Sequence, residues 1–217
     1  MFELYYTPGT CSLAVHIALI QASLPHRLHL VRLQEAEQLR AGYEQIHPLR
    51  RVPALRLENG RMLTEVTAIL FYLASQSNAP HLLPTSEEER SLALEWMGLL
   101  SAAVHPSFWG FIRPDRYCSD EAAQAMIKKE TPERFFSMLQ HVEARLNAGS
   151  ADFVQKYDFL AAYSFVFYLW AVRLKLPMTE LPMYTRLVRH LIETAPVQQA
   201  LTNEGASEML ERLTALR

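Results

Sequence analysis

The chain of 217 residues carries 21 Lys and Arg against 23 Asp and Glu, which gives a formal net charge of −2. Half of the residues are hydrophobic and a fifth are charged, which is typical of a globular protein and excludes a disordered chain. The near-neutral charge argues against a nucleic-acid or anionic-membrane partner, because neither would be attracted by a net positive field. Two cysteines, no secretory signal and no apolar stretch of the roughly 20 residues that a bilayer requires predict a cytoplasmic protein.

The first 77 residues alternate strand-like and helical patterns. An alternating aromatic run ends at Thr7-Pro8-Gly9, and apolar residues at helical spacing follow. Asn59-Gly60, between two apolar runs, is a strong hairpin signal. The expected order is a strand at 2–6, a helix at 12–22, a strand at 28–33, a hairpin formed by 52–57 and 61–64, and a helix from Ala68. This order predicts a small α/β domain over residues 1–77.

A proline-bearing linker is expected at 78–86, and no convincing strand follows it, so residues 87–217 are predicted to form an all-helical domain. Residues 159–174 are apolar almost all round, which predicts the centre of the second core. The expected helix starts are a capping box of Ser86 and Glu89, Thr131-Pro132, Asp158 as an N-cap, Pro182 and Pro196.

Cys11 is the strongest candidate for chemistry. It follows the first strand and lies at the first turn of the first predicted helix. Unpaired N–H groups at a helix N-terminus stabilise a thiolate, so we expect a lowered pKa for this thiol. A small buried hydrophobe is the alternative interpretation, since free cysteines usually play that part.

Other chemistries find little support in the sequence. Ser12, Leu13 and Ala14 follow Cys11, so a two-cysteine redox centre is excluded. The two cysteines lie far apart and the eight histidines form no ligand pair, so we expect no metal. With seven glycines in the chain, no phosphate-binding glycine loop occurs.

The run from Tyr5 to Ala14, Tyr-Tyr-Thr-Pro-Gly-Thr-Cys-Ser-Leu-Ala, resembles the start of a bacterial beta-class glutathione S-transferase. Four further blocks match in order: 52–55, 63–69, 94–96 and 196–205. The resemblance covers nearly the whole chain. It implies a thioredoxin-like, glutathione-binding N-terminal domain, a helical C-terminal domain and a homodimer that uses glutathione as co-substrate.

The resemblance also implies roles for single residues. Cys11 would lie beside the glutathione sulfur, and His105 would line the same cleft from the second domain. Pro53 would be the cis-proline, and the backbone of Val52 would contact the cysteinyl part of glutathione. Glu65, with Val66 after it, would hold the γ-glutamyl end. The second domain would supply an apolar wall for a small hydrophobic co-substrate, for which the candidates are Phe108, Trp109, Phe111, Tyr117 and Phe167.

Several positions depart from the family's pattern around the ligand. Val66 stands where the family has serine, and the loss of one hydrogen bond to a charged group costs about 1.5–3 kcal/mol. Arg50 replaces a loop glycine, which predicts a reshaped loop, and Pro106 is expected to kink the helix and re-aim His105. The family's loop lysine is absent, which leaves the arginines at 32, 40, 50 and 51 as candidates to replace it.

These observations favour a glutathione-dependent transferase or thiol-exchange enzyme that acts through Cys11, with a weakened glutathione site. Two alternatives stay open at this point. In the first, the chain is a non-catalytic binding or regulatory member of the family. In the second, it is a member that recognises a different thiol or an acidic ligand through its arginines.

Overall fold

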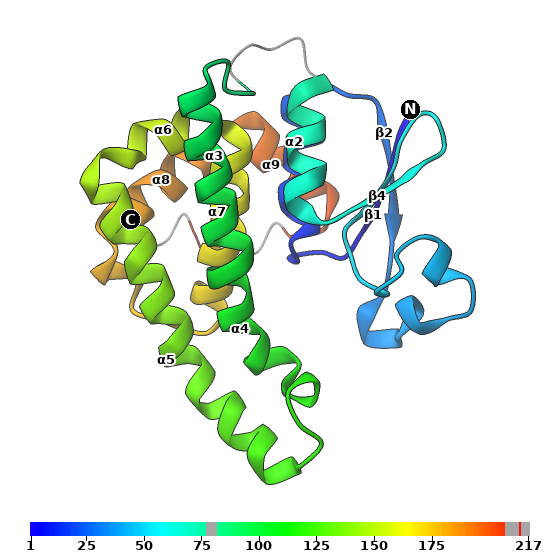
Figure 1. The fold of residues 1–217 in the computed structure, drawn as a ribbon, viewed down its shortest axis with the longest axis vertical. Coiled ribbons are helices and arrows are strands. Elements are labelled where there is room, and N and C mark those ends of the chain that lie inside the picture. Colours follow the sequence, from blue (N-terminus) through cyan, green and yellow to red (C-terminus); the bar gives the residue numbers. More distant parts are fainter. Residues whose placement is uncertain (77–81, 207–212, 214–217) are drawn as a thin grey trace.

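The N-terminal part of the chain folds into a four-stranded mixed sheet with helices, as predicted (Figure 1). The computed structural model describes residues 1–76, 82–206 and 213. The strand order is β2-β1-β3-β4, in which β1 pairs with β2 in parallel and β3 pairs antiparallel with β1 and β4. The elements are β1 Phe2–Tyr6, α1 Ser12–Gln21, β2 His26–Leu30, β3 Ala54–Arg56, β4 Met62–Thr64 and α2 Val66–Gln76. Short 3₁₀ turns occupy Leu33–Glu35, Glu37–Leu39 and Tyr43–Gln45.

Two predicted boundaries in this part were wrong. The second strand begins two residues and ends three residues earlier than expected, because His26 pairs with Phe2 and the ladder ends where the Val31 N–H donates to the Tyr6 carbonyl at 2.8 Å. The Thr7 hydroxyl then donates to the Val31 carbonyl, and the chain turns away. The last helix of the sheet domain begins at Val66 rather than Ala68, directly after Glu65.

The second part is all helical among its described residues. Its elements are α3 Glu87–Leu99, a π-helical turn Leu100–Val104, α4 His105–Ile112, a 3₁₀ turn Pro114–Arg116, α5 Glu121–Arg145, a π-helical segment Leu146–Ser150, α6 Ala151–Lys156, α7 Asp158–Arg173, a 3₁₀ turn Met178–Glu180, α8 Pro182–Ile192 and α9 Ala195–Asn203. In Figure 1, α7 lies inside the group of helices. Its residues from Phe159 to Ala171 are buried, which confirms the predicted core.

The helix starts agree with the sequence at three of the five expected places. The Ser86 hydroxyl accepts from the Glu89 N–H at 3.1 Å, and Pro182 and Pro196 lie in the first turns of α8 and α9. Residue 77 and residues 78–81 of the expected linker lie outside the described residues, so the linker and the domain boundaries stay a prediction.

Thr131-Pro132 and Asp158 were placed wrongly. Pro132 lies inside α5, whose N-cap is Asp120, and the Asp120 carboxylate accepts from the Ala123 N–H at 2.7 Å. The Thr131 hydroxyl donates to the Ile127 carbonyl at 2.7 Å, one turn back in the same helix. The long helix thus continues through a residue that normally ends one. Asp158 lies in the first turn of α7, and Tyr157 is the N-cap.

A π-helical turn separates α3 from α4. It spans Leu100–Val104, and Pro106 follows in the first turn of α4. The His105 N–H donates to the Leu100 carbonyl, five residues back, so the helical run continues from the π-helical turn into α4. The helix therefore does not end at Pro106, and the change of helix type comes just before His105.

The two parts of the chain are joined through α1 and the turn before it, since α1 packs against α7 and α9. His16 of α1 is fully buried, and its Nδ1 lies 3.0 Å from Glu204 Oε1. The Gly9 N–H donates to Glu204 Oε2 at 3.3 Å, and the Gly9 carbonyl accepts from Trp170 Nε1 at 3.0 Å and Arg173 Nη1 at 3.3 Å. Gly9 has a φ of 68°, and an added Cβ would overlap the Arg173 guanidinium. We call this set of contacts at residues 9, 16, 170, 173 and 204 the Gly9 clamp.

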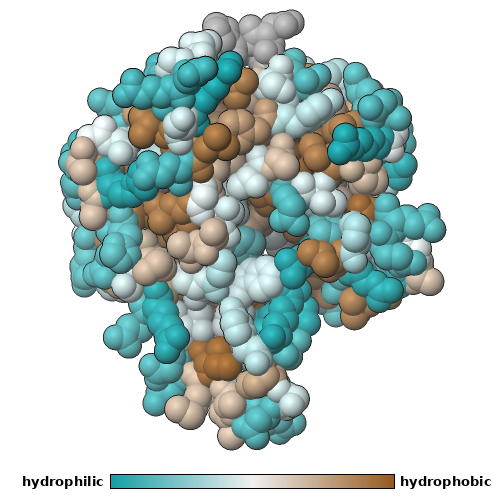
Figure 2. Space-filling model, viewed as in Figure 1, coloured by the Kyte–Doolittle hydropathy of each residue, from teal (hydrophilic) through white to brown (hydrophobic). Residues whose placement is uncertain are grey.

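The surface is mixed in character. On the face shown in Figure 2, hydrophobic residues occur in small groups between hydrophilic ones, and the surface is hollowed between the two domains. Within the described part of the chain, no helix has both the length and the apolar content needed to cross a membrane.

Candidate functional site

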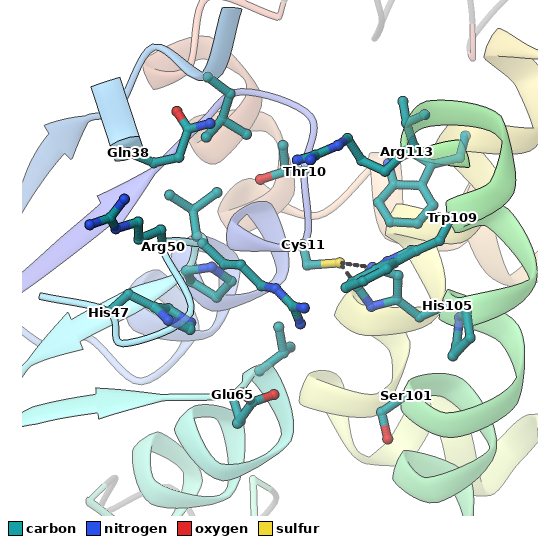
Figure 3. A pocket seen from close by; sticks show the side chains of 18 of the residues that line it. Thr10, Cys11, Gln38, His47, Arg50, Glu65, Ser101, His105, Trp109 and Arg113 are labelled. Carbon is teal, nitrogen blue, oxygen red and sulfur yellow. Dashed lines mark hydrogen bonds between the residues drawn. The ribbon is translucent and has the colours of Figure 1, made fainter. Parts of the chain in front are cut away.

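A cavity of about 680 Å³ lies between the two domains. All six residues predicted for the site line it: Cys11, Val52, Pro53, Glu65, Val66 and His105. Figure 3 shows Cys11 at the centre, with His47, Arg50 and Glu65 of the sheet domain on one side, and His105 and Trp109 of α4 with Arg113 directly after it on the other. The structure thus brings these residues together, and the role of each stays a prediction.

A compact turn holds Cys11 at the start of α1. The Ser12 hydroxyl donates to the Thr7 carbonyl at 3.0 Å and accepts from the Thr7 N–H at 3.1 Å. The Thr10 hydroxyl also donates to the Thr7 carbonyl, at 2.9 Å. Cys11 is the N-cap of α1, so its sulfur lies at the positive end of the helix dipole.

The expected thiolate at Cys11 is contradicted. The residue is 3% exposed, and burial raises the pKa of its thiol far above the usual range. Hydrogen bonds from its own backbone and from the Tyr163 hydroxyl lower the pKa by less than burial raises it. The helix N-terminus alone therefore does not ionise this sulfur, and Cys11 is a neutral thiol at pH 7 in the free protein.

His105 faces the sulfur from the second domain. The Cys11 Sγ lies 3.7 Å from His105 Nδ1 and 3.8 Å from Nε2, and the Tyr163 hydroxyl lies 3.5 Å from Nδ1. Burial is the main cause that lowers the pKa of His105 to about 4, and the positive charges of Arg51 and Arg116 lower it further. The imidazole is therefore neutral at pH 7, with one nitrogen that donates and one that accepts.

We expect His105 to make the protein less stable in acid. Its pKa is lower in the folded chain than in the unfolded one, so the unfolded chain binds more protons between pH 6.5 and 4, and stability falls as the pH falls through this window. The shift corresponds to about 3 kcal/mol. Urea unfolding at a series of pH values measures the free energy of unfolding that is lost as the pH falls from 6.5 to 4. In His105→Gln this loss should be smaller by about the same amount. The matched control is His190→Gln, which changes an exposed histidine. Equal slopes of the free energy of unfolding against pH in His105→Gln and the wild type would contradict the expectation.

The loop before β3 presents backbone groups to the cavity. The Val52–Pro53 peptide bond is cis, as the resemblance implies. No hydrogen bond among the described residues uses the N–H or the carbonyl of Val52. Arg50, at the position of the family's glycine, keeps a left-handed conformation with a φ of 52°, a conformation that costs about 1–2 kcal/mol in a residue other than glycine. The backbone at Arg50 is therefore strained, at the position where the family has glycine.

Glu65 is a second strained residue at the cavity. Its φ is 68°, and α2 begins directly after it at Val66. Left-handed residues that are not glycine cluster at functional sites. Thr67 lines the cavity as well as Val66, although adjacent helix positions point about 100° apart. The N-terminus of α2 therefore faces the cavity, where its first N–H groups suit an anion.

Among the five candidates for an apolar wall, one lines the cavity, and its part in holding a co-substrate stays a prediction. Trp109 lines the cavity, whereas Phe108 and Phe167 are buried in the core, Tyr117 is 55% exposed and Phe111 packs against the core. Sequence reasoning missed Tyr163 and Trp170 of α7, because their helix is apolar all round and its spacing does not distinguish a residue at the cavity from one in the core.

The candidate arginines separate into two groups. Arg50 and Arg51 line the cavity. Arg32 and Arg40 instead pair with Glu37, at 3.1 and 3.3 Å. Arg113 and Arg116, after α4, also line the cavity and were missed, because nothing in their spacing marks them. Among the described residues, no group of three or more His, Cys, Asp or Glu side chains is arranged to hold a metal ion.

Comparisons with known proteins identify the family. Residues 9–76 match the family model of the glutathione S-transferase N-terminal domain. Glutathione S-transferase GstA of Escherichia coli O157:H7 is 31% identical over 94% of this chain and 98% of its own length. The chain therefore belongs to the glutathione S-transferase family.

Solved structures agree with this assignment. A glutathione transferase homologue from Sulfitobacter, solved with bound glutathione, has a TM-score of 0.89 and 29% identity over 95% of this chain and 99% of its own. A beta-class glutathione S-transferase from Sphingomonas chungbukensis has a TM-score of 0.80 and 26% identity, over 94% of this chain and 99% of its own. The relatives thus include beta-class members, as the opening block of the sequence indicates.

Proposed function

We propose that the protein is a glutathione transferase that joins the sulfur of glutathione to a small electrophile in the cavity between its domains. The observation that carries this proposal is the meeting of Cys11, His105 and Tyr163 at the N-terminus of α1, beside Val52 and Glu65. The similarity to the Sulfitobacter homologue, which was solved with bound glutathione, supports the choice of thiol.

Glutathione would lie along the sheet domain. The unengaged N–H and carbonyl of Val52 suit the peptide groups of its cysteinyl residue, in the manner of an added strand. The carboxylate of Glu65 suits the α-ammonium of the γ-glutamyl end, and the first N–H groups of α2 suit the adjacent carboxylate. Gln38, which is 9% exposed at the cavity and whose Oε1 has no partner among the described residues, suits an amide N–H of the tripeptide.

The nucleophile in this proposal is the glutathione sulfur, not Cys11. A thiol at the N-terminus of α1 meets the positive end of the helix and three donors, the Cys11 thiol, the Tyr163 hydroxyl and an N–H of neutral His105. Burial raises the pKa of both Cys11 and Tyr163, so both keep their protons at pH 7 and donate them in hydrogen bonds. The raised pKa of Cys11 disfavours thiol exchange through this residue, because the thiolate is the attacking species.

We infer a weakened hold on the γ-glutamyl carboxylate. Val66 offers its N–H but no hydroxyl, and its side chain is 8% exposed at the cavity. The homodimer, the small co-substrate with an apolar part and the cytoplasmic location belong to the same proposal, supported by membership of the family.

Calorimetric titration with glutathione tests the proposal. We expect binding by the wild type and binding weakened about 10- to 100-fold in Glu65→Gln, which removes the charge opposite the α-ammonium. The exposed Glu88→Gln is the matched control. Undetectable binding by the wild type, or an unchanged dissociation constant in Glu65→Gln, would overturn the proposed site.

The same titration measures the effect of Val66. Val66→Ser adds the missing hydroxyl and is expected to tighten glutathione binding about tenfold. Val66→Ala, which removes the same methyl groups without adding a donor, separates the hydroxyl from the change in packing. Equal affinities in the two variants would mean that the hydroxyl has no part in binding.

A further inference from the structure

Two arginines lie over one indole ring at the α4 side of the cavity. The Arg51 guanidinium carbon is 4.4 Å from the centroid of the Trp109 ring, and that of Arg116 is 4.2 Å from it. Arg51 belongs to the loop before β3, whereas Trp109 and Arg116 belong to the helical domain. We call Arg51 and Arg116, together with the Trp109 ring that both contact, the Trp109 arginine pair. This group spans the cavity from one domain to the other.

The positive charge of this pair is not balanced within the described residues. Arg113 has Asp115 at 2.6 Å and Arg50 has Glu44 at 3.6 Å, but Arg51 and Arg116 make no ion pair in the described part of the chain. The described lining holds four arginines and a single carboxylate, that of Glu65. Two like charges held close to one ring repel each other, so an anion that reaches both guanidinium groups would be attracted strongly.

The Trp109 arginine pair is close to Cys11, beside which the glutathione sulfur is placed above. The Trp109 ring is 5.5 Å from that of His105, one helical turn earlier, and His105 contacts Cys11. The charges of both arginines lower the pKa of His105, which agrees with this proximity. Apolar side chains of Pro106 and Ile112 line the same side of the cavity. Pro106, Trp109, Ile112 and Arg116 belong to the helical domain, opposite the sheet domain along which glutathione is placed above, whereas Arg51 directly precedes Val52 in the sheet domain.

We propose that the second substrate is an electrophile with a carboxylate or similar anionic group on a flat apolar body. The anion would pair with Arg51 and Arg116, and the body would lie against Trp109 and the apolar side chains beside it. This inference rests on the proposed function and specifies the class of its co-substrate. Guanidinium groups suit the task, because their planar donors match the geometry of a carboxylate.

The reaction with a chloroarene probe is balanced. The glutathione thiol gives its proton to solvent, its sulfur forms a bond to the ring carbon that carries chlorine, and chloride leaves with the electrons of the broken bond. Negative charge develops on the ring in the transition state, and the two guanidinium groups would stabilise it for any chloroarene. A substrate carboxylate adds an attraction that its neutral amide lacks.

The test compares 4-chloro-3,5-dinitrobenzoate with its neutral amide at saturating glutathione. We expect kcat/KM of the wild type to favour the benzoate by about tenfold, an effect of about 1.4 kcal/mol. In the Arg51→Gln/Arg116→Gln double variant this preference should fall to about one. The matched control is Arg61→Gln, which changes an exposed arginine and should keep the preference for the benzoate. Equal rates for the two substrates in the wild type, or a preference that survives in the double variant, would overturn the inference.

A binding measurement separates this inference from the proposed function. Quenching of tryptophan fluorescence by unreactive 3,5-dinitrobenzoate and 3,5-dinitrobenzamide reports affinity even without turnover. Tighter binding of the benzoate that depends on the two arginines supports the anion site, including in a protein that fails to bind glutathione. Equal binding of both ligands overturns it, including in a protein that conjugates glutathione. Loss of glutathione affinity in the double variant, with the benzoate preference retained, would assign the arginines to glutathione and overturn the inference as well.

Discussion

Replacement of Glu204 by alanine is expected to lower the free energy of unfolding by about 3 kcal/mol or more. The Glu204 carboxylate is buried and accepts from both His16 and the Gly9 N–H, so its removal leaves two buried donors without an acceptor. Each buried donor that is left without an acceptor costs about 1–3 kcal/mol. Urea unfolding at pH 7 measures the change.

Two further variants make this measurement specific. Glu204→Gln keeps one acceptor oxygen but presents an amide N–H to the other donor. We therefore expect its free energy of unfolding to lie between those of Glu204→Ala and the wild type. The exposed Glu193→Ala, in the segment between α8 and α9, is expected to stay within about 0.5 kcal/mol of the wild type. A Glu204→Ala protein as stable as Glu193→Ala would show that the Gly9 clamp contributes little to stability.

The second large effect concerns Cys11. Replacement by alanine is expected to lower kcat/KM for conjugation of 1-chloro-2,4-dinitrobenzene by about 10- to 100-fold, because a hydrogen bond to a charged group contributes about 1.5–3 kcal/mol. Replacement by serine keeps a donor at the same place and is expected to retain activity within about threefold. This pattern follows from a buried thiol that keeps its proton.

The serine variant separates a donor from a nucleophile. A covalent part for Cys11 requires sulfur, so Cys11→Ser would then be as inactive as Cys11→Ala. Cys118→Ser changes the other free cysteine, which does not line the described cavity, and is expected to behave as the wild type. Initial rates at saturating glutathione, together with the glutathione dissociation constant of each variant, complete the comparison.

Local signals in the sequence predicted most of the fold. The aromatic alternation of residues 2–6, the Asn59-Gly60 turn and the apolar run after Asp158 each reflect a preference that a few neighbouring residues determine. Pro132 shows where this reasoning fails, because contacts along α5 override a local signal that favours a helix start. The second strand was misplaced for a related reason, since its alternation is poor and its register is set by pairing with β1.

The position of Cys11 at a helix start and the family pattern together predicted the residues that line the cavity at its centre. Cys11, Val52, Pro53, Glu65, Val66 and His105 all line the described cavity. The protonation state of Cys11 was predicted wrongly, because the sequence shows the helix N-terminus but not the side chains that exclude water from it. Arg116 over Trp109 and Glu204 beside His16 are contacts between distant parts of the chain, and no spacing rule predicts them.

The π-helical turn at Leu100–Val104 sets the rotation of α4 relative to α3. Each residue of an α-helix turns its successors by about 100°. Deletion of one residue within the turn would therefore rotate His105 and Trp109 together, away from the sulfur and away from Arg51. The helix type of these five residues thus couples the orientation of His105 toward Cys11 to the orientation of Trp109 toward Arg51.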